Sequence, residues 1–175
     1  MDLGSGDGRT VITAAKRGAT AMGVEYNPDM VELSKANAAK ENVSAKATFV
    51  KADLYETDFS KATVITMFLL PEINVKLRPK ILNLKPGTRV VSNSFTMEEW
   101  EADETATVDE CTSWCTAYLW IIPAKVEGTW RVGQSDLTLR QEFQKVSGTL
   151  GSTPISDGRL RGDVFTVTAG AEIYT

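Results

Sequence analysis

The amino-acid sequence predicts an α/β fold, in which a mostly parallel sheet carries helices on both faces and is followed by a small antiparallel β-meander. Helix-like and strand-like segments alternate over the first two thirds of the chain, which is typical of a parallel sheet. From residue 125 onward helix signals vanish, and short strands alternate with glycine turns. Apolar residues make up 42% and charged residues 24% of the 175 residues, as expected for one core with a small appendage.

Two helices with clear ends open the chain. The first is expected over 8–17, because its apolar residues share one face and Gly18 follows as a stop signal. Asn27-Pro28-Asp29 begins the second, with a capping residue, a proline at the first helical position and an acid in the first turn. This helix is expected to reach about residue 42, with Met30 and Leu33 facing inward. Strands are expected over 19–25, 45–51 and 62–70.

A third helix is expected over 71–84. It contains Pro79, which lacks an N–H group and clashes with the preceding turn, so we expect a break there. A turn at 85–87 precedes a strand over 88–93, and a sixth strand follows over 116–122.

The C-terminal part predicts about four antiparallel strands. Apolar and polar residues alternate along 137–143 and again along 165–167. Turns are expected at 156–158 and 161–163. We therefore expect two parts, a core over 1–123 and a β-meander extension over 124–175.

Composition argues against several partners. A net charge of −4 and a pI near 5.0 disfavour a broad nucleic-acid-binding face. No apolar run approaches the roughly 20 residues of a membrane-spanning helix, and the first residues lack a signal-peptide pattern. Cys111 and Cys115 are the only cysteines. We therefore expect inert reduced thiols, no metal site and a cytoplasmic location.

The chain contains no histidine. This excludes Ser-His-Asp and Cys-His catalysis, histidine metal sites and the usual general base near neutral pH. Any chemistry must use carboxylates, hydroxyls, amines or a cofactor that is already activated.

A glycine-rich segment precedes the first expected helix. Its glycines occupy positions 4, 6 and 8, where they allow a tight turn and a close approach of the backbone to a ligand. The helix N-terminus adds N–H groups without intrahelical partners, and we expect the loop amides to face the ligand. A G-x-G-x-x-G dinucleotide fingerprint requires glycine at position 9, where this chain has Arg9. The spacing therefore disfavours NAD and FAD.

Residues 2–8 instead resemble motif I, D-x-G-x-G-x-G, of the class I, Rossmann-like S-adenosylmethionine-dependent methyltransferases, without a mismatch. The resemblance implies a Rossmann-like fold and S-adenosylmethionine as the cofactor. Glu25, at the end of the second strand, is then expected to accept hydrogen bonds from both ribose hydroxyls. Asp53 is expected beside the adenine amino group, and Asp2 close to the methionine moiety. The full set of cofactor-binding candidates is Asp2, Gly4, Ser5, Gly6, Gly8, Glu25, Tyr26, Asp53 and Leu54.

Three further segments narrow the resemblance to a smaller group of methyltransferases. Residues 24–28, 68–72 and 84–92 look like bacterial methyltransferases and the mitochondrial protein-lysine methyltransferases that act on the ATP synthase c-subunit and the adenine nucleotide translocator. The similarity covers about residues 1–123 and implies protein lysine as the acceptor. The acceptor pocket is then expected at the catalytic candidates Phe68, Pro71 and Glu72. Phe68 is expected to form an aromatic wall, and Glu72 to attract or deprotonate the amine.

Two other functions stay open. Because members of this family place a longer strand and further residues before motif I, we expect an N-terminally truncated chain. A truncated core can bind S-adenosylmethionine without transferring a methyl group, or act as a self-associating structural fragment. Exposed sheet edges favour a homo-oligomer.

Overall fold

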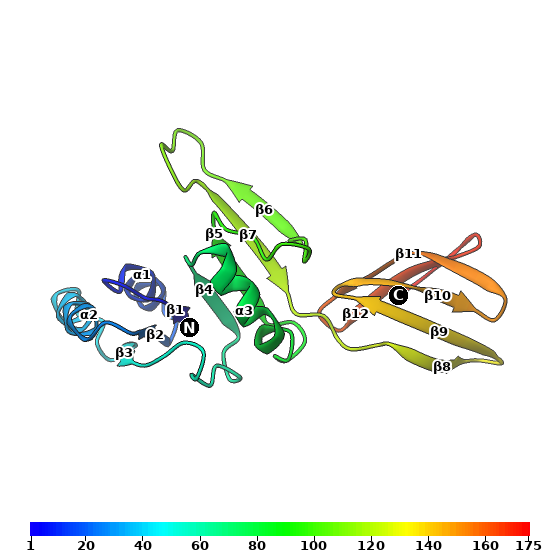
Figure 1. The fold of residues 1–175 in the computed structure, drawn as a ribbon, viewed down its shortest axis with the longest axis horizontal. Coiled ribbons are helices and arrows are strands. Elements are labelled where there is room, and N and C mark those ends of the chain that lie inside the picture. The colour runs from blue at the N-terminus through cyan, green and yellow to red at the C-terminus, as the bar shows by residue number, and fades with distance from the viewer. The chain divides into compact units, whose positions relative to one another are not determined.

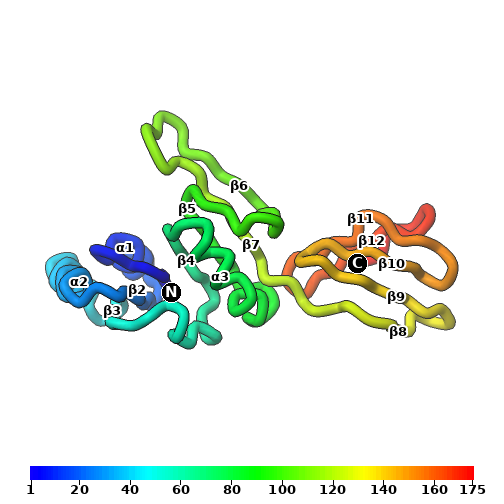
Figure 2. Tube along the Cα trace, in the orientation of Figure 1, coloured from blue at the N-terminus to red at the C-terminus, as the bar shows by residue number.

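The computed structural model describes all 175 residues. The chain forms two compact units, Met1–Pro79 with Arg89–Trp120, and Lys80–Thr88 with Ile121–Thr175. Figure 1 labels all elements except β13, and Figure 2 follows the chain by colour from its N-terminus to its C-terminus. No helix in the structure has the length and apolar character needed to cross a bilayer.

The first unit contains a seven-stranded sheet in the order β3-β2-β1-β4-β5-β7-β6. β1 to β5 pair in parallel, and β6 pairs antiparallel with β7. The chain moves outward from β1 in one direction and then from β4 in the other, which creates a switch point where α/β proteins bind ligands. The elements are β1 (Asp2–Leu3), α1 (Arg9–Lys16), β2 (Ala21–Glu25), α2 (Pro28–Lys40), β3 (Ala47–Lys51), β4 (Val64–Met67), α3 (Pro71–Ile81), β5 (Arg89–Asn93), β6 (Glu104–Thr107) and β7 (Thr116–Ile121).

Helices cover both faces of this sheet, which confirms the expected fold class. Asp2, Gly23 and Phe49 are register partners on β1, β2 and β3, so they share a face. Phe49 packs there against α1 and α2. Ser92 of β5 lies one residue out of that row and faces the other side, where Asn74 of α3 donates to its hydroxyl group.

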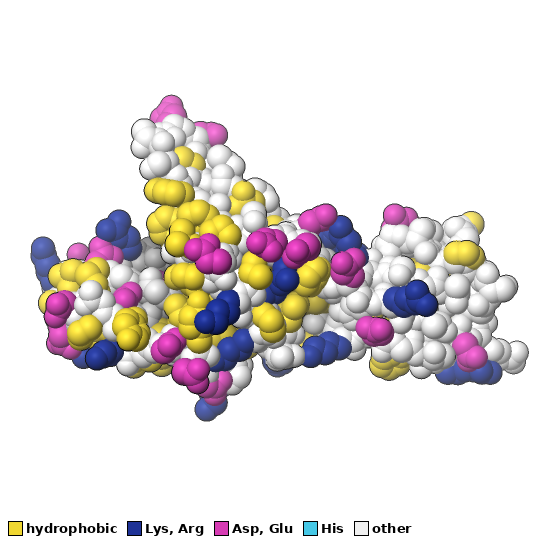
Figure 3. Space-filling model, in the orientation of Figure 1, with side chains coloured by type: hydrophobic (Ala, Val, Ile, Leu, Met, Phe, Trp, Pro, Cys, Tyr) yellow, Lys and Arg dark blue, Asp and Glu magenta, His cyan; other side chains and the backbone are white.

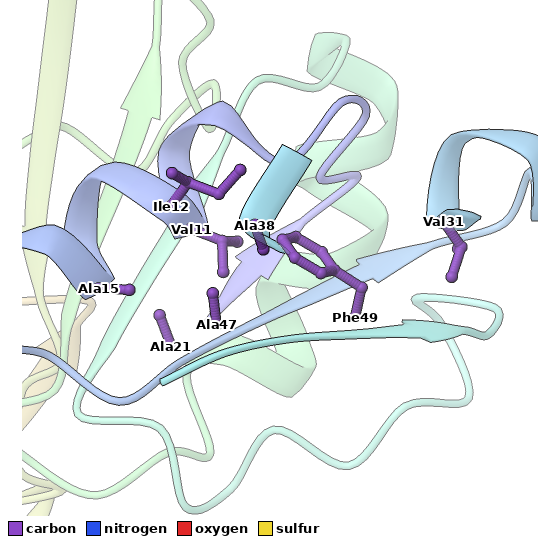
Figure 4. Close-up of a cluster of buried hydrophobic side chains, with 8 residues drawn as sticks. All are labelled: Val11, Ile12, Ala15, Ala21, Val31, Ala38, Ala47 and Phe49. Carbon is purple, nitrogen blue, oxygen red and sulfur yellow. The ribbon is translucent and has the colours of Figure 1, made fainter. Parts of the chain in front are cut away.

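The core between the sheet and α1–α2 is small and closely packed (Figure 4). Phe49 from β3 extends its ring toward Val11 of α1 and Ala38 of α2. Short side chains let the helices approach the strands, so the largest member of the cluster fills the gap between them. The buried residues are Val11, Ile12, Ala15, Ala21, Val31, Ala38, Ala47 and Phe49.

The inward face of α2 differs from the one expected. Asn27 caps the helix as predicted, since its side-chain oxygen accepts a hydrogen bond from the Asp29 amide. Leu33, however, is 45% exposed, and Met30 is half-buried. The buried positions are Val31, Ser34 and Ala38, which follow the i, i+3, i+7 spacing of one helix face. The apolar character of Leu33 did not predict the buried face, because the contact between α2 and the sheet requires small side chains.

Pro79 does not break α3, and the expected interruption is wrong. The helix continues from Pro71 to Ile81, with Pro79 in its last turn. Leu77 and Ile81 are almost fully buried on either side of the proline. Their burial stabilises the last turn and offsets the hydrogen bond that Pro79 cannot donate.

Cys111 and Cys115 form a disulfide, so the expectation of inert thiols is wrong. The sequence interval of four suggested a shared helix face, but the segment is the loop of the β6–β7 hairpin. Thr107 pairs with Thr116 at the base of this hairpin, which brings the two ends of the loop together. The two Cα atoms are 5.6 Å apart, within the range that a disulfide requires. Reduced cysteines therefore no longer support the expected cytoplasmic location.

The second unit is an antiparallel sheet of six strands, where about four were expected. Its order is β13-β12-β11-β10-β9-β8, with each strand beside its neighbour in sequence. The strands are β8 (Gly128–Val132), β9 (Ser135–Glu142), β10 (Lys145–Leu150), β11 (Thr153–Arg161), β12 (Val164–Ala169) and β13 (Glu172–Tyr174). Their inward side chains form a separate core of Leu139, Val146, Ile155, Leu160, Val167 and Ala169.

One of the two turns expected in this part is present. Residues 161–163 connect β11 to β12, with Gly162 at a φ of 67°. Residues 156–158 instead lie inside β11, where the pairing register shifts and Asp157 has a φ of 54°. The Ser-Asp-Gly signal marks a β-bulge rather than a turn, because both structures place a residue in the left-handed region.

Substituting Gly23 with alanine is expected to lower the free energy of unfolding by about 1–3 kcal/mol, the usual range for overpacking. A Cβ atom at this position lies 2.5 Å from the Ser5 hydroxyl oxygen and 2.7 Å from the Phe49 ring. Denaturant unfolding of Gly23→Ala measures the change. Thr20→Ala, at an exposed position before the same strand, is the control and should stay within about 0.5 kcal/mol of the parent. Equal stability of both variants would contradict the packing of the loop on β2.

Candidate functional site

The glycine-rich loop between β1 and α1 lies at the switch point of the sheet. Its backbone adopts left-handed angles, with φ of 74° at Gly4 and 82° at Gly8. There is also no space for a side chain at either position. A Cβ on Gly4 lies 2.8 Å from Leu69, and one on Gly8 lies 2.7 Å from the ring of Phe49. Glycine is therefore required here both by conformation and by contact.

Most of the loop amides are satisfied within the protein, which differs from the expectation that they face a ligand. Gly4 and Ser5 donate to the Val24 carbonyl oxygen at 2.9 and 3.0 Å, and Gly8 donates to the Ser5 carbonyl. Arg9 donates to a carboxylate oxygen of Asp7. A pyrophosphate requires free N–H groups at the helix end. Since these amides already have partners, they are not available to a ligand, and the loop presents backbone carbonyls and Cα atoms instead.

Glu25 joins the end of β2 to this loop. One carboxylate oxygen accepts a hydrogen bond from the Gly6 amide at 2.9 Å, and the other accepts from the Asn27 amide at 3.0 Å. Each oxygen keeps a further lone pair for a ligand. Glu25 is half-buried, so its carboxylate is fixed in direction while it remains accessible to a ligand.

Two polar side chains of α2 hold the loop from the other side. The Ser34 hydroxyl group donates to the Gly6 carbonyl at 2.7 Å, and the Asn37 side chain donates to the Asp7 carbonyl at 3.0 Å. Neither residue was predicted from the sequence. Their signal was a polar pair three residues apart on the face of a helix that packs on the core, where apolar residues are the rule.

Asp2 is a buried acid beside the loop, with 7% of its surface exposed. The Thr66 hydroxyl group donates to its carboxylate at 2.6 Å. Burial raises the pKa of Asp2 to about 6, and the Thr66 hydrogen bond and the nearby N-terminal ammonium oppose the rise only in part. The acid is therefore ionised near neutral pH, but at a cost that a cationic ligand group can offset.

A cleft of about 700 Å³ runs along the loop, within the size range of small-molecule sites. Five of the predicted site residues line it, Asp2, Gly4, Ser5, Gly6 and Phe68. The lining residues that the sequence analysis did not identify are Asp7, Arg9, Thr10, Met30, Thr66, Met67, Val91, Asn93, Ser113 and Trp114. The cleft contains no lysine, and its one arginine, Arg9, is paired with Asp7 at 2.7 Å.

Five predicted cofactor residues do not line the cleft, Glu25 among them, and the other four are Gly8, Tyr26, Asp53 and Leu54. Gly8 packs against Phe49 and Ser34, and Tyr26 is 74% exposed. Asp53 is exposed and accepts a hydrogen bond from the Tyr55 amide, and Leu54 is half-buried. Their roles stay predictions.

The catalytic candidates of α3 also stay predictions. Pro71 and Glu72 form the first turn of the helix, with Pro71 half-buried and Glu72 exposed, and neither lines the cleft. An acid in a first helical turn is favourable for the helix dipole in any case. Of the three candidates, the structure places only Phe68 at the cleft.

The site contains a buried carboxylate, a second fixed carboxylate and a loop of close-packed glycines. No group of three potential ligand side chains lies close enough to hold a metal ion. A ligand suited to this arrangement has hydroxyl groups for Glu25 and a cationic group for Asp2, and needs no phosphate. An adenosyl group joined to an amino acid has these features, so the residues present fit S-adenosylmethionine.

Comparison with known proteins gives the same answer. A family described as the ANTKMT methyltransferase domain matches residues 2–104. A protein-lysine N-methyltransferase of Saccharolobus islandicus is 45% identical over 69% of this chain and 77% of its own length. The human lysine N-methyltransferase of the ATP synthase c-subunit is 38% identical over 59% of this chain, and the match spans 45% of the human protein.

A solved structure shows the same fold with the cofactor product in place. The RNA methyltransferase from Salinibacter ruber, crystallised with S-adenosyl-L-homocysteine, is 44% identical and has a TM-score of 0.66. The similarity covers 71% of this chain and 80% of that one. The glycine loop, the two acids and these comparisons lead to one conclusion. The chain belongs to the ANTKMT methyltransferase domain family of Rossmann-like, S-adenosylmethionine-dependent methyltransferases.

Proposed function

We propose that the chain transfers a methyl group from S-adenosylmethionine to the side-chain amine of a lysine in a protein. The observation that carries this proposal is the cleft beside the glycine loop, which joins a cofactor site to an apolar, aromatic side without a lysine or a free arginine. When bound, S-adenosylmethionine supplies a methyl group that is already activated, so no histidine is needed.

The chain's own residues fix the cofactor at both ends in this proposal. Glu25 receives the ribose hydroxyls, because the Gly6 and Asn27 amides orient its carboxylate. Asp2 receives the α-amino group of the methionine part, because it is the buried carboxylate of the cleft. Gly4 and Gly6 leave room for the ligand above the loop.

Lysine is supported by the relatives whose names give an acceptor. The Saccharolobus protein is a protein-lysine methyltransferase, and the human protein acts on lysine in the ATP synthase c-subunit. A lysine must lose its proton before it attacks, and an apolar wall lowers the pKa of an amine by desolvation. Phe68 supplies such a surface at the cleft.

RNA is the second candidate acceptor, because the Salinibacter protein is described as an RNA methyltransferase. RNA binding needs basic side chains for the phosphates. This chain has a net charge of −4, and the face shown in Figure 3 has its Lys and Arg side chains scattered among acids. Charge therefore favours a protein acceptor.

Self-association is a further part of the proposal. β3 and β6 are the edges of the first sheet, and every residue of β6 is exposed. An open edge is a template for another strand. Light scattering during size-exclusion chromatography gives the mass in solution and so distinguishes a homo-oligomer from a monomer.

Asp2→Asn is expected to weaken S-adenosylmethionine binding at least tenfold, measured by calorimetry at pH 8. The variant keeps an oxygen for Thr66 but loses the negative charge that faces the amino group. Asp163→Asn, at an exposed position in a turn of the second unit, is the control and should bind as the parent does. Unchanged affinity in Asp2→Asn would remove Asp2 from the cofactor site.

The same substitution is expected to stabilise the protein without cofactor at pH 8. The pKa of Asp2 is higher in the folded state, about 6, than its ordinary value of 3.8. The folded state therefore binds this proton more tightly, and the contribution of Asp2 to stability is greatest below pH 4 and is lost as the pH rises through 6. By pH 8 this loss is about 3 kcal/mol, which Asp2→Asn removes. Denaturant unfolding at pH 4 and pH 8 measures the effect; a variant less stable than the parent at pH 8 would contradict the burial argument.

Labelled S-adenosylmethionine is expected to transfer its methyl group to protein in a cell extract. Digestion with protease should release the label, digestion with ribonuclease should leave it, and mass spectrometry should place it on lysine. Glu25→Gln, which keeps one acceptor oxygen of two, should reduce the labelling at limiting cofactor and recover it at saturating cofactor. Label released by ribonuclease would identify RNA as the acceptor instead.

A further inference from the structure

Three aromatic side chains from separate parts of the chain meet at the cleft. Phe68 follows β4, Phe95 follows β5, and Trp114 precedes β7. The ring centroids of Phe68 and Phe95 are 5.7 Å apart, and each lies 5.4 Å from that of Trp114. We call these three residues the aromatic wall. Phe68 and Trp114 line the cleft directly.

The aromatic wall is exposed, although its members pack on one another. Phe68 is 48% and Trp114 57% exposed. Aromatic rings bury large apolar areas when they have the opportunity, so a group of exposed rings beside a cleft indicates a binding surface. Figure 3 shows apolar side chains gathered at the surface in the region from which the β6–β7 hairpin rises.

Separate contacts hold the segments that carry these rings. The Asn74 side chain, which is fully buried, donates to the carbonyl oxygens of Phe95 and Thr96 at 3.4 and 3.1 Å. The Ser94 amide donates to the Thr116 carbonyl at 2.7 Å, which joins the end of β5 to the start of β7. The rings are therefore arranged before any ligand binds, which reduces the entropy lost on binding.

Trp114 is held in a backbone conformation that bulky residues rarely adopt. Its φ is 58°, in the left-handed region. The Cys111–Cys115 disulfide closes the loop next to it, and the Val108 amide donates to the Cys115 carbonyl at 2.9 Å. Strain of this kind persists where the surrounding structure imposes it, and it concentrates at ligand sites.

We propose that the aromatic wall of Phe68, Phe95 and Trp114 is the acceptor subsite, which recognises the alkylammonium group of the substrate through cation–π contacts. This rests on the proposed function and names the residues that set its acceptor specificity. Aromatic faces attract ammonium and methylated ammonium groups. The cleft has no lysine to repel such a cation, and Arg9 is neutralised by Asp7.

A nucleobase is the other ligand that stacks on aromatic rings. It brings phosphates, and the cleft offers them no unpaired basic side chain. The absence of an unpaired basic side chain for the phosphates therefore favours the ammonium group.

The first test is steady-state methyl transfer to a lysine-containing acceptor protein. Trp114→Ala is expected to raise the KM for the acceptor about five- to tenfold, with kcat and the cofactor dissociation constant within about twofold of the parent. Trp114→Phe should restore most of the affinity, because it keeps an aromatic face. Trp130→Ala, at a 51% exposed tryptophan of the second unit, is the matched control and should leave KM unchanged. Thermal unfolding checks that each variant is folded.

The second test does not depend on turnover. With S-adenosyl-L-homocysteine saturating the cofactor site, tetramethylammonium should shift the indole N–H resonance of Trp114. This resonance is assigned as the one that is missing from the spectrum of Trp114→Phe. Uncharged tert-butanol of similar shape should not shift it. An unchanged KM in Trp114→Ala, or a shift with uridine and none with tetramethylammonium, would overturn the aromatic wall as an ammonium site. Cation binding without any lysine methylation would leave the aromatic wall standing and refute the proposed acceptor.

Discussion

The hydrogen bond from the Gly6 amide to Glu25 ties the glycine loop to the end of β2, and the site depends on it. Two neighbouring contacts act in the same direction, since Val24 accepts from the loop amides and Ser34 of α2 donates to the Gly6 carbonyl. The loop is thus held by β2 on one side and by α2 on the other. A loop fixed in this way can place a ligand against the sheet and loses little conformational entropy when the ligand binds.

The same arrangement explains why the site contains a buried acid whose ionised form destabilises the fold. Asp2 is buried at the centre of the sheet, between β2 and β4, where its ionised form is disfavoured and its pKa rises to about 6. A structural role alone would be served better by an uncharged side chain that keeps the hydrogen bond with Thr66. Retention of a carboxylate there is consistent with a ligand that carries a positive charge, because such a ligand restores the lost solvation.

Most of the parallel core could be predicted from the sequence, but little of the acceptor side of the cleft could. The glycine spacing and the cap at Asn27 are local signals, read from neighbouring residues, and they predicted the loop and α2. The inward face of α2, the disulfide and the bulge at Asp157 depend on tertiary packing and strand pairing, and here local interpretation was wrong. Phe95 and Trp114 were missed for the same reason. Nothing near either residue shows that the carboxyl end of β5 and the β6–β7 loop meet Phe68.

The cofactor side and the acceptor side of the cleft therefore bind chemically different groups. Carboxylates hold the first, where hydroxyl and amino groups need fixed acceptors. Aromatic rings border the second, where an amine must be held and yet lose its proton. A carboxylate beside that amine stabilises the charged form and raises its pKa, whereas an apolar surface disfavours the charge and lowers it. Ring faces attract the ammonium group as it arrives, while the water that they exclude favours the neutral amine, so the rings lower the pKa of the amine where desolvation outweighs the cation–π attraction. A chain without histidine can then promote deprotonation through the environment of the acceptor rather than through a dedicated base.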